Sequence, residues 1–398
     1  MSVPPPAAPT HLLRLHSHSI NVLAFSEDND RLYSGDASGF VAVTSTRSLR
    51  AIAKWQAHSD GLLGLEEWGD EVITHGRDNK LHVWKRIAEL PGSVRLGDTA
   101  ASVDLPAPHL SYSMDINALN YCRFSLMPVE SEEKSALIAV PGLIDSSVAD
   151  IWSLPSGSRI HAAIGQEIQK SIFSADQKGR NNAGIIMGLH LFKSHVASSG
   201  SQHDELRLLC AYENGSVTLR KYARTDNSTS VGGAGWEILW TSKLHVETVM
   251  AMRVSYQNDF AITVSADHLV CRYDISGAVV SPERACIAHR MKHPGNASIA
   301  IREDDKVCAI GGWDGSVRLF STRTIKPLGT LKYHKSSCQA IEFARSPANA
   351  ESPTTPNDDD ESDDELTLEE RTKRGRWLVA GGKDGRISIW SLISFSKS

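Results

Sequence analysis

The sequence lacks the features that carry a chain into or across a membrane. It has no run of about 18 apolar residues, which a membrane span requires, and MSVPPPAAPT at its start has no basic region followed by an apolar one. Its six cysteines never form a C-x-x-C pair, so the ligand spacing of a zinc site is missing. We therefore expect a soluble intracellular protein with reduced cysteines, no metal and no cofactor.

Basic charge and common catalytic motifs are also scarce. The net charge is −5 and aromatic residues make up 7% of the chain, whereas a nucleic-acid-binding domain usually has a basic surplus. The sequence contains no G-x-S-x-G, no H-E-x-x-H and no P-loop, the signatures of serine hydrolases, zinc proteases and nucleotide-binding enzymes. We expect no enzyme, no small-molecule substrate, no membrane contact and no direct contact with nucleic acid.

What the sequence does contain is a repeat. GGWDGSVRLF (311–320) and GGKDGRISIW (381–390) share an Asp that precedes an aromatic residue by six positions. Seven related copies have their turns at Ser38, Asp78, a disturbed turn before Trp152, Asn214, Asp267, Asp314 and Asp384. Alternating apolar residues flank each turn, which predicts two strands joined by a hairpin.

A histidine precedes most copies, four residues before an apolar run. These are His16, His58, His245 and His334, with His293 in a looser position. We expect each His to hydrogen-bond the turn Asp and to reach a Ser or Thr on the second strand, such as Thr74 or Ser265, because buried polar groups must be paired. The predicted structural network comprises His58, Asp78, Trp84, His245, Asp267, His293, Asp314, His334, Asp384 and Trp390. A catalytic His–Asp dyad is disfavoured because the pair recurs in several copies.

Each unit resembles the WD40 repeat, which has four strands and a period of about 40–45 residues. The seven copies predict an all-β fold, a seven-bladed WD40 β-propeller spanning 11–398 after a flexible N-terminus at 1–10. NALNYCRF (117–124) and IIMGLHLF (185–192) are expected to be the first strands of the third and fourth blades. We expect strand 11–15, HLLRL, to complete the last blade and close the ring.

Two insertions interrupt the repeat. Residues 85–111 predict a long loop that joins the second and third blades. Residues 346–376 predict a disordered acidic insertion within the seventh blade, because nine of the thirteen residues in 358–370 are Asp or Glu. Within it, Ser362 precedes three acidic residues and is a candidate phosphosite. The insertion is either a regulated docking tail or a solvated loop, and RTKRGR (371–376) is either an import signal or a counter-charge to the acidic run.

One residue of each turn is a candidate for partner binding. The residue before the turn acceptor should project from the face of the ring that propellers use for binding. These candidates are Arg77, Glu213, Trp313 and Lys383. Trp313 is either an interface anchor or a residue packed against the next blade.

Several segments resemble one WD40 family in particular. AIGGWDGSVRLFSTRTIKPLGTLKYHKSSCQAIEFA, VAGGKDGRISIWSL, INALNYCRF and ALIAVPGLIDSSVADIW are similar to the family of ASTRA-associated WD40 proteins and its animal relative, the guanine nucleotide-binding protein subunit beta-like protein. The resemblance covers about 11–345 and 377–395 and does not include the acidic insertion.

This resemblance implies a non-catalytic scaffold subunit of the nuclear ASTRA complex. It implies a link to chromatin remodelling and to the assembly and stability of phosphatidylinositol-3-kinase-related kinases. Its partners would be other subunits of the assembly, namely kinase co-chaperones and large kinase-related proteins. The expected location is the nucleus, with the cytoplasm as a further site.

Two other functions stay open. The chain could be a ubiquitin-ligase substrate receptor or another propeller adaptor, although residues 84–87, WKRI, do not match the W-D-x-R motif of such receptors. It could also be an enzyme with a site in the central channel, which the sequence does not address.

Overall fold

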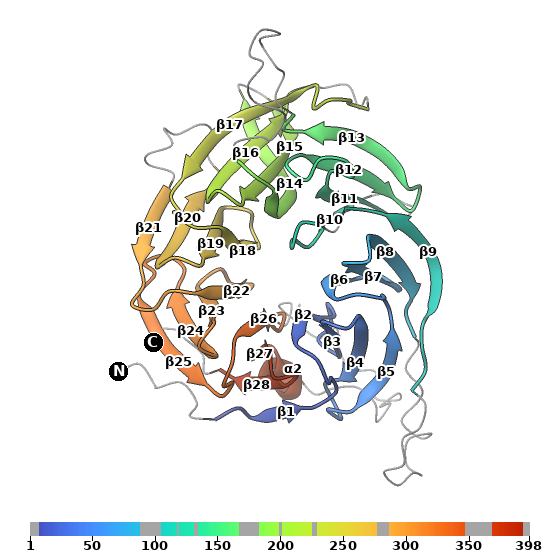
Figure 1. Ribbon diagram of the computed structural model, residues 1–398, viewed down its shortest axis with the longest axis vertical. Coiled ribbons are helices and arrows are strands. Elements are labelled where there is room, and N and C mark those ends of the chain that lie inside the picture. The colour runs from blue at the N-terminus through green and yellow to red at the C-terminus, as the bar shows by residue number, and fades with distance from the viewer. Residues whose placement is uncertain are drawn as a thin grey trace, which may run out of the picture.

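The computed structural model forms a ring of blades around a central opening (Figure 1). It describes residues 8–87, 105–117, 119–130, 134–166, 183–198, 201–224, 229–276, 286–346 and 368–392. Within these ranges the regular structure consists of seven four-stranded antiparallel sheets and the short helix α2 (Leu368–Arg374). The predicted seven-bladed WD40 propeller is confirmed.

The two inner strands of each blade carry most of the core. The innermost strands are β2 (Ile20–Phe25), β6 (Leu62–Trp68), β10 (Ser125–Val129), β14 (Ile186–Ser198), β18 (Val249–Val254), β22 (Asn296–Ile301) and β26 (Cys338–Phe343). The second strands are β3 (Arg31–Asp36), β7 (Glu71–Gly76), β11 (Ser135–Pro141), β15 (Ser201–Tyr212), β19 (Phe260–Ser265), β23 (Val307–Gly312) and β27 (Trp377–Gly382). Every residue of β3, β19, β23 and β27 is buried, because each blade packs face to face against both neighbours.

The two outer strands of each blade are more exposed to solvent than the inner two, and the outermost strand is the most exposed. The third strands are β4 (Phe40–Ser45), β8 (Lys80–Lys85), β12 (Ala149–Leu154), β16 (Ser216–Tyr222), β20 (Leu269–Asp274), β24 (Ser316–Ser321) and β28 (Ile387–Ser391). The outermost strands are β5 (Ala51–Gln56), β9 (His109–Asp115), β13 (Ser158–Ile164), β17 (Trp236–Lys243), β21 (Cys286–Arg290), β25 (Pro327–Lys332) and β1 (His11–Leu13). No residue of β9 is buried.

The first strand of the chain closes the ring, as predicted. β1 pairs antiparallel with β28, with Leu12 opposite Ser388, so the blade that ends the chain takes its outer strand from the beginning. The next contact is equally close, because a Cβ added at Gly381 would collide with the Ile20 side chain of blade one. Closure thus removes the unpaired edge that an open sheet would expose.

Three boundaries differ from the sequence predictions. The insertion at 85–111 lies within blade two, between β8 and β9, and does not join blades two and three. Residues 117–124 are not a strand, because β10 begins only at Ser125. The last part of the 346–376 insertion is ordered, since it contains α2.

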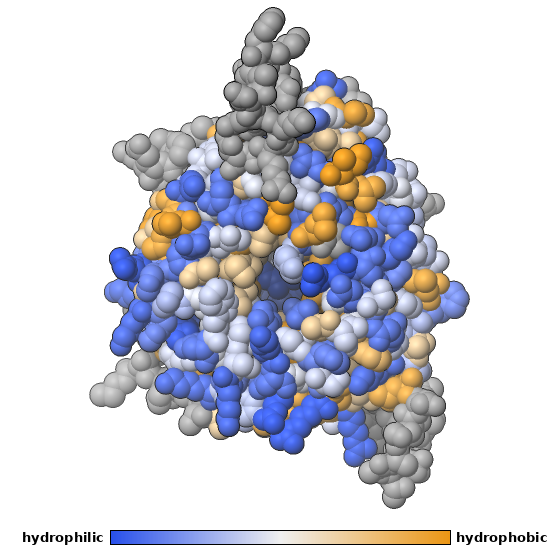
Figure 2. Space-filling model, viewed as in Figure 1, coloured by the Kyte–Doolittle hydropathy of each residue, from blue (hydrophilic) through white to orange (hydrophobic). Residues whose placement is uncertain are grey.

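The surface of the ring is largely hydrophilic, and a hollow marks its centre (Figure 2). In the described part of the chain, no helix has the length and hydrophobicity that a bilayer span requires.

Candidate functional site on the turn face

The hairpins that join the second and third strands of the blades lie on one side of the ring, together with the loops that lead into the blades, because neighbouring strands are antiparallel. We call this side the turn face. Five turns are joined to their incoming loops by a backbone hydrogen bond of 2.9 Å, from N–H to carbonyl oxygen: Ala37 to Ser19, Arg77 to Gly61, Glu213 to Ile185, Trp313 to Gly295 and Lys383 to Ser337. Each turn and its loop therefore form one fixed unit.

A side-chain oxygen shapes every turn by accepting the backbone N–H two residues further on, as in an Asx turn. The acceptors are Asp36, Asp78, Asp145, Asn214, Asp267, Asp314 and Asp384, at 2.8 to 3.3 Å. In blade three the acceptor is Asp145, in the copy whose turn the sequence left disturbed. In blade one it is Asp36, two residues before the predicted turn residue, Ser38.

Blade two contains a polar network of four side chains. The Nδ1–H of His58 donates to Asp78 at 2.9 Å, since a carboxylate can only accept, and Nε2 lies 2.8 Å from the Thr74 hydroxyl. The indole N–H of Trp84 donates to the same hydroxyl at 2.9 Å. Burial lowers the pKa of His58 despite the nearby carboxylate, so its ring is neutral and Nε2 accepts a hydrogen bond from the Thr74 hydroxyl. The four side chains thus link the turn to the closing strand.

Blades five and seven repeat this network with changed partners. In blade five, His245 lies 3.0 Å from Asp267 and 2.8 Å from the hydroxyl of Thr263. The predicted partner, Ser265, instead accepts the backbone N–H of Asp267.

In blade seven, His334 lies 3.1 Å from Asp384 and 2.9 Å from Ser388, which also accepts the Trp390 indole N–H at 3.0 Å. Ser388 belongs to the third strand, β28, and not to the second strand as predicted.

Blade one has a network that the sequence reading missed. His16 lies 2.8 Å from Asp36 and 2.8 Å from the Ser34 hydroxyl. Burial alone would raise the pKa of Asp36, but hydrogen bonds from His16 and Ser38 hold it at about 2. The signal was present in the 20-residue separation of His16 and Asp36, which equals that of His58 and Asp78.

Blade six corrects the expected pairing of His293 with Asp314. The carboxylate of Asp314 pairs with the guanidinium of Arg318 at 2.5 Å, and His293 is exposed. A Cβ at Gly312 would collide with the Arg318–Asp314 pair, just as a Cβ at Gly76 would collide with His58. Arg318 therefore occupies the place that the His ring takes in blade two. The carboxylate of Asp314 pairs with Arg318 and not with His293.

Blade three has Asn side chains in place of the His. The amide of Asn117 donates to Gly142 O at 2.7 Å and to the Ser146 hydroxyl at 2.9 Å. The amide of Asn120 donates to Ser146 O and to Ile186 O, both at 2.8 Å. These two residues join the incoming loop to the turn and to blade four. Because the sequence analysis assigned 117–124 to a strand, it did not identify these two residues as part of a polar network.

The histidines of these networks lie inside the blades. The side chains of His58 and His245 are fully buried, so no substrate reaches them. In the described ranges, His58, Asp78 and His82 come closest to a metal site, with ligand atoms within 4.8 Å of one another. The same His–Asp contact occurs in blades one, five and seven without a third ligand, so hydrogen bonding accounts for the pair.

The four candidate partner-binding side chains are exposed on the turn face. Arg77 lies over the ring of Tyr121, with 4.7 Å from its guanidinium carbon to the ring centroid, and donates to the Tyr121 hydroxyl at 3.2 Å. Trp313 is 48% exposed, yet a Cβ at Gly295 would collide with its ring. Trp313 therefore packs on its own incoming loop while one side of the indole stays open.

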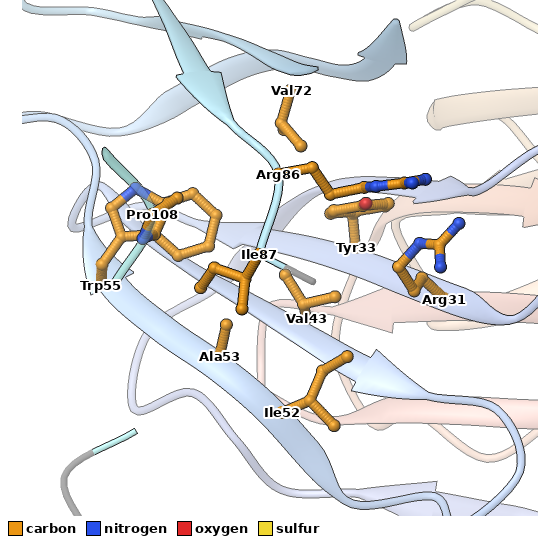
Figure 3. Close-up of a pocket in the computed structure, with 10 residues that line it drawn as sticks. All are labelled: Arg31, Tyr33, Val43, Ile52, Ala53, Trp55, Val72, Arg86, Ile87 and Pro108. Atoms are coloured by element: carbon orange, nitrogen blue, oxygen red, sulfur yellow. The ribbon is translucent and has the colours of Figure 1, made fainter. Parts of the chain in front are cut away.

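A separate hollow lies between blades one and two (Figure 3). It is lined by Arg31, Tyr33, Val43, Ile52, Ala53, Trp55, Val72, Arg86, Ile87 and Pro108. Glu67 accepts hydrogen bonds from Tyr33, Arg31 and Arg86. The polar groups of these three lining residues are therefore paired with the Glu67 carboxylate. The rest of the lining is mainly apolar.

The predicted features of the acidic insertion fall mostly outside the described residues, including Ser362. Of RTKRGR, Arg374 is buried and donates to the Thr46 hydroxyl at 3.1 Å. Its guanidinium also lies 3.6 Å from Asp30. The basic run is thus not an extended exposed segment in this structure.

Comparisons with known proteins agree with this geometry. The WD domain, G-beta repeat family matches residues 8–44 and 372–391, on either side of the ring closure. ASTRA-associated protein 1 of Verticillium alfalfae is 33% identical over 98% of this chain and 94% of its own length. The proteins of that name from Pyricularia oryzae and Schizosaccharomyces pombe are 29% and 27% identical, over 98% and 84% of this chain and 99% and 93% of their own lengths.

Proposed function

The chain belongs to the ASTRA-associated protein 1 family of WD40 propellers, and from that membership we propose that it is a non-catalytic scaffold subunit of the ASTRA complex. It works in the nucleus, in chromatin remodelling and in the assembly and stability of phosphatidylinositol-3-kinase-related kinases. Its partners are kinase co-chaperones and the large kinase-related proteins themselves. The observation that carries the proposal is the similarity to ASTRA-associated proteins along almost the whole chain.

The arrangement of polar groups supports a scaffold over an enzyme. Titratable side chains of the inner strands and their incoming loops are paired across blades: Arg123 with Glu66 at 3.2 Å, and Arg253 with Glu342 at 2.7 Å. Because these charges neutralise each other between blades two and three and between blades five and seven, they stabilise the ring. The exposed turns offer binding surface instead of reactive groups.

Purification of the tagged protein from nuclear extract tests this function. We expect the kinase-related proteins and their co-chaperones to co-purify and their steady-state levels to fall when the protein is depleted. Recovery of a ubiquitin-ligase core would instead show a substrate receptor. Recovery of none of these proteins, with kinase levels unchanged on depletion, would refute the scaffold proposal.

A further inference from the structure

Blade three carries a group of exposed apolar side chains on the turn face. Ile144 is 97% exposed, Leu119 73%, Tyr121 61% and Leu143 48%. Leu143 and Ile144 belong to the turn between β11 and β12, and Leu119 and Tyr121 belong to the loop that leads into the blade. We call these four residues the blade-three patch. A group of large apolar side chains exposed on an otherwise polar surface is a candidate interaction site.

The loop and the turn are held next to each other. Asn117 and Asn120, on either side of position 118, donate to Gly142, Ser146 and Ile186, and the N–H of Leu119 donates to the Asn117 side chain at 2.9 Å. Residues 117, 119 and 120 are therefore held against the turn before any partner binds. Such preorganisation reduces the entropy that binding has to overcome.

The other turns of the ring differ from this one. The residues before their turn acceptors include Arg77, Glu213 and Lys383, and Trp313 is partly covered by its own loop. Blade three alone among the described turns places two consecutive large aliphatic residues there, and nothing in the fold requires Ile144 to be apolar.

A positive charge borders the patch. The guanidinium of Arg77 rests on the Tyr121 ring, and within the described residues it forms no ion pair with a carboxylate. Tyr and Arg are also the residue types most often found at the centre of protein interfaces. The rim of the patch is thus complementary to a carboxylate.

We propose that the blade-three patch, with Arg77, binds a segment of another protein that combines apolar side chains with an acidic residue. The aliphatic side chains of that segment cover Leu119, Leu143 and Ile144, and its carboxylate pairs with Arg77 beside Tyr121. This inference rests on the proposed scaffold function and assigns one of its docking surfaces.

Site-specific photo-crosslinking tests the occupant directly. A photoreactive amino acid replaces Ile144 in the tagged full-length chain, and the same residue replaces Ile238 of β17, which is 61% exposed on blade four, as the matched control. We expect a crosslink at 144 but not at 238. The crosslinked peptide, read by mass spectrometry, should belong to another protein and contain apolar residues next to Asp or Glu.

The identified peptide, made synthetically, then serves as the probe for affinity. Leu143→Ser with Ile144→Ser should weaken its binding about tenfold or more, as loss of interface anchors does, while Ile238→Ser should not. Arg77→Glu should weaken the binding of the same peptide about tenfold. A variant peptide, in which Lys replaces the acidic residue, should bind the Arg77→Glu protein with restored affinity. Unchanged thermal unfolding of each variant shows that folding is intact.

Four outcomes overturn the inference: no crosslink at 144 above that at 238, a crosslinked peptide from a second copy of this chain, a peptide whose flanking charges are basic, or failure of the Arg77→Glu reversal. Failure of this inference does not refute the scaffold proposal. If the doubly substituted protein still recovers the kinase-related proteins at wild-type levels and no crosslink forms at 144, the patch is not the docking surface but the scaffold function stands.

Discussion

Blades two and three solve the same structural problem with different side chains. Blade two links its turn to its closing strand through Asp78, His58, Thr74 and Trp84. Blade three has no such chain, and the amides of Asn117 and Asn120 tie its loop to its turn instead. Both blades tie the incoming loop to the turn through side-chain hydrogen bonds, but of these two turns only that of blade three presents large aliphatic side chains to solvent.

The difference shows that the blade requires a paired polar group at this position and not a particular residue. Blade six provides a third solution, in which Arg318 takes the place of the His ring above Gly312. Since an unpaired buried group costs about 1–3 kcal/mol, each solution is constrained by its partners, while the exposed part of the turn is free to serve binding.

Asp78→Ala should produce the largest loss of stability. It removes the acceptor of the His58 N–H and of the backbone N–H groups of Ser59 and Lys80, and should lower the free energy of unfolding by about 3 kcal/mol. Urea unfolding followed by fluorescence measures this change. The control is Asp145→Ala in blade three, where in the described part of the chain the carboxylate hydrogen-bonds only Ser147, and about 1 kcal/mol should be lost. Equal losses in the two variants would contradict a special role for the network in blade two.

Asn120→Ala should follow, with a loss of about 2 kcal/mol. Its amide is the donor to two carbonyl oxygens, Ser146 O and Ile186 O, at the junction of blades three and four, and both would remain buried without it. Within the described residues, the side-chain oxygen of Asn120 has no hydrogen-bond partner, so its removal offsets part of the cost. Hydrogen exchange should show faster opening of β10 and β14 than of β6 and β7. Uniform exchange across the ring would show that Asn120 does not fix this junction.

The sequence was sufficient for the fold but not for the partners of each network. Asp spacing and hairpin chemistry recur often enough to show seven blades, and Thr74 was identified as the partner of His58. The sequence could not show that Ser388 would replace a second-strand residue, or that Arg318 would replace His293, because side chains from different strands reach the same point in space. The blade-three patch required the structure, since exposure of Leu119 and Ile144 depends on how a loop and a turn lie side by side.

His75 of blade two should make the stability of the ring depend on pH. It is fully buried, neither ring nitrogen has a hydrogen-bond partner among the residues that the structure describes, and burial lowers its pKa to about 3. Between that value and the ordinary pKa of about 6.5, only the unfolded chain binds the proton, so stability falls as pH falls, by about 1.4 kcal/mol per pH unit.

His75→Leu removes this titration. The variant should be as stable as the wild type at pH 7 or slightly more stable, and clearly more stable at pH 5. Unfolding measured at both pH values decides, with His11→Leu, in the partly exposed β1, as the control. If the pH dependence of His75→Leu matches that of the wild type, the acid sensitivity arises from the other buried histidines.

The smallest expected effects concern the closing aromatic residues of blades two and five. Trp84 donates to Thr74 at 2.9 Å, whereas the Tyr273 hydroxyl lies 3.4 Å from Thr263. Trp84→Phe should therefore cost about 1 kcal/mol beyond its loss of apolar contact, and Tyr273→Phe about half as much. A double-mutant cycle of Trp84→Phe with Thr74→Val isolates the hydrogen-bond contribution. A coupling energy near zero would mean that Trp84 stabilises blade two by packing alone, and the His network would then end at Thr74.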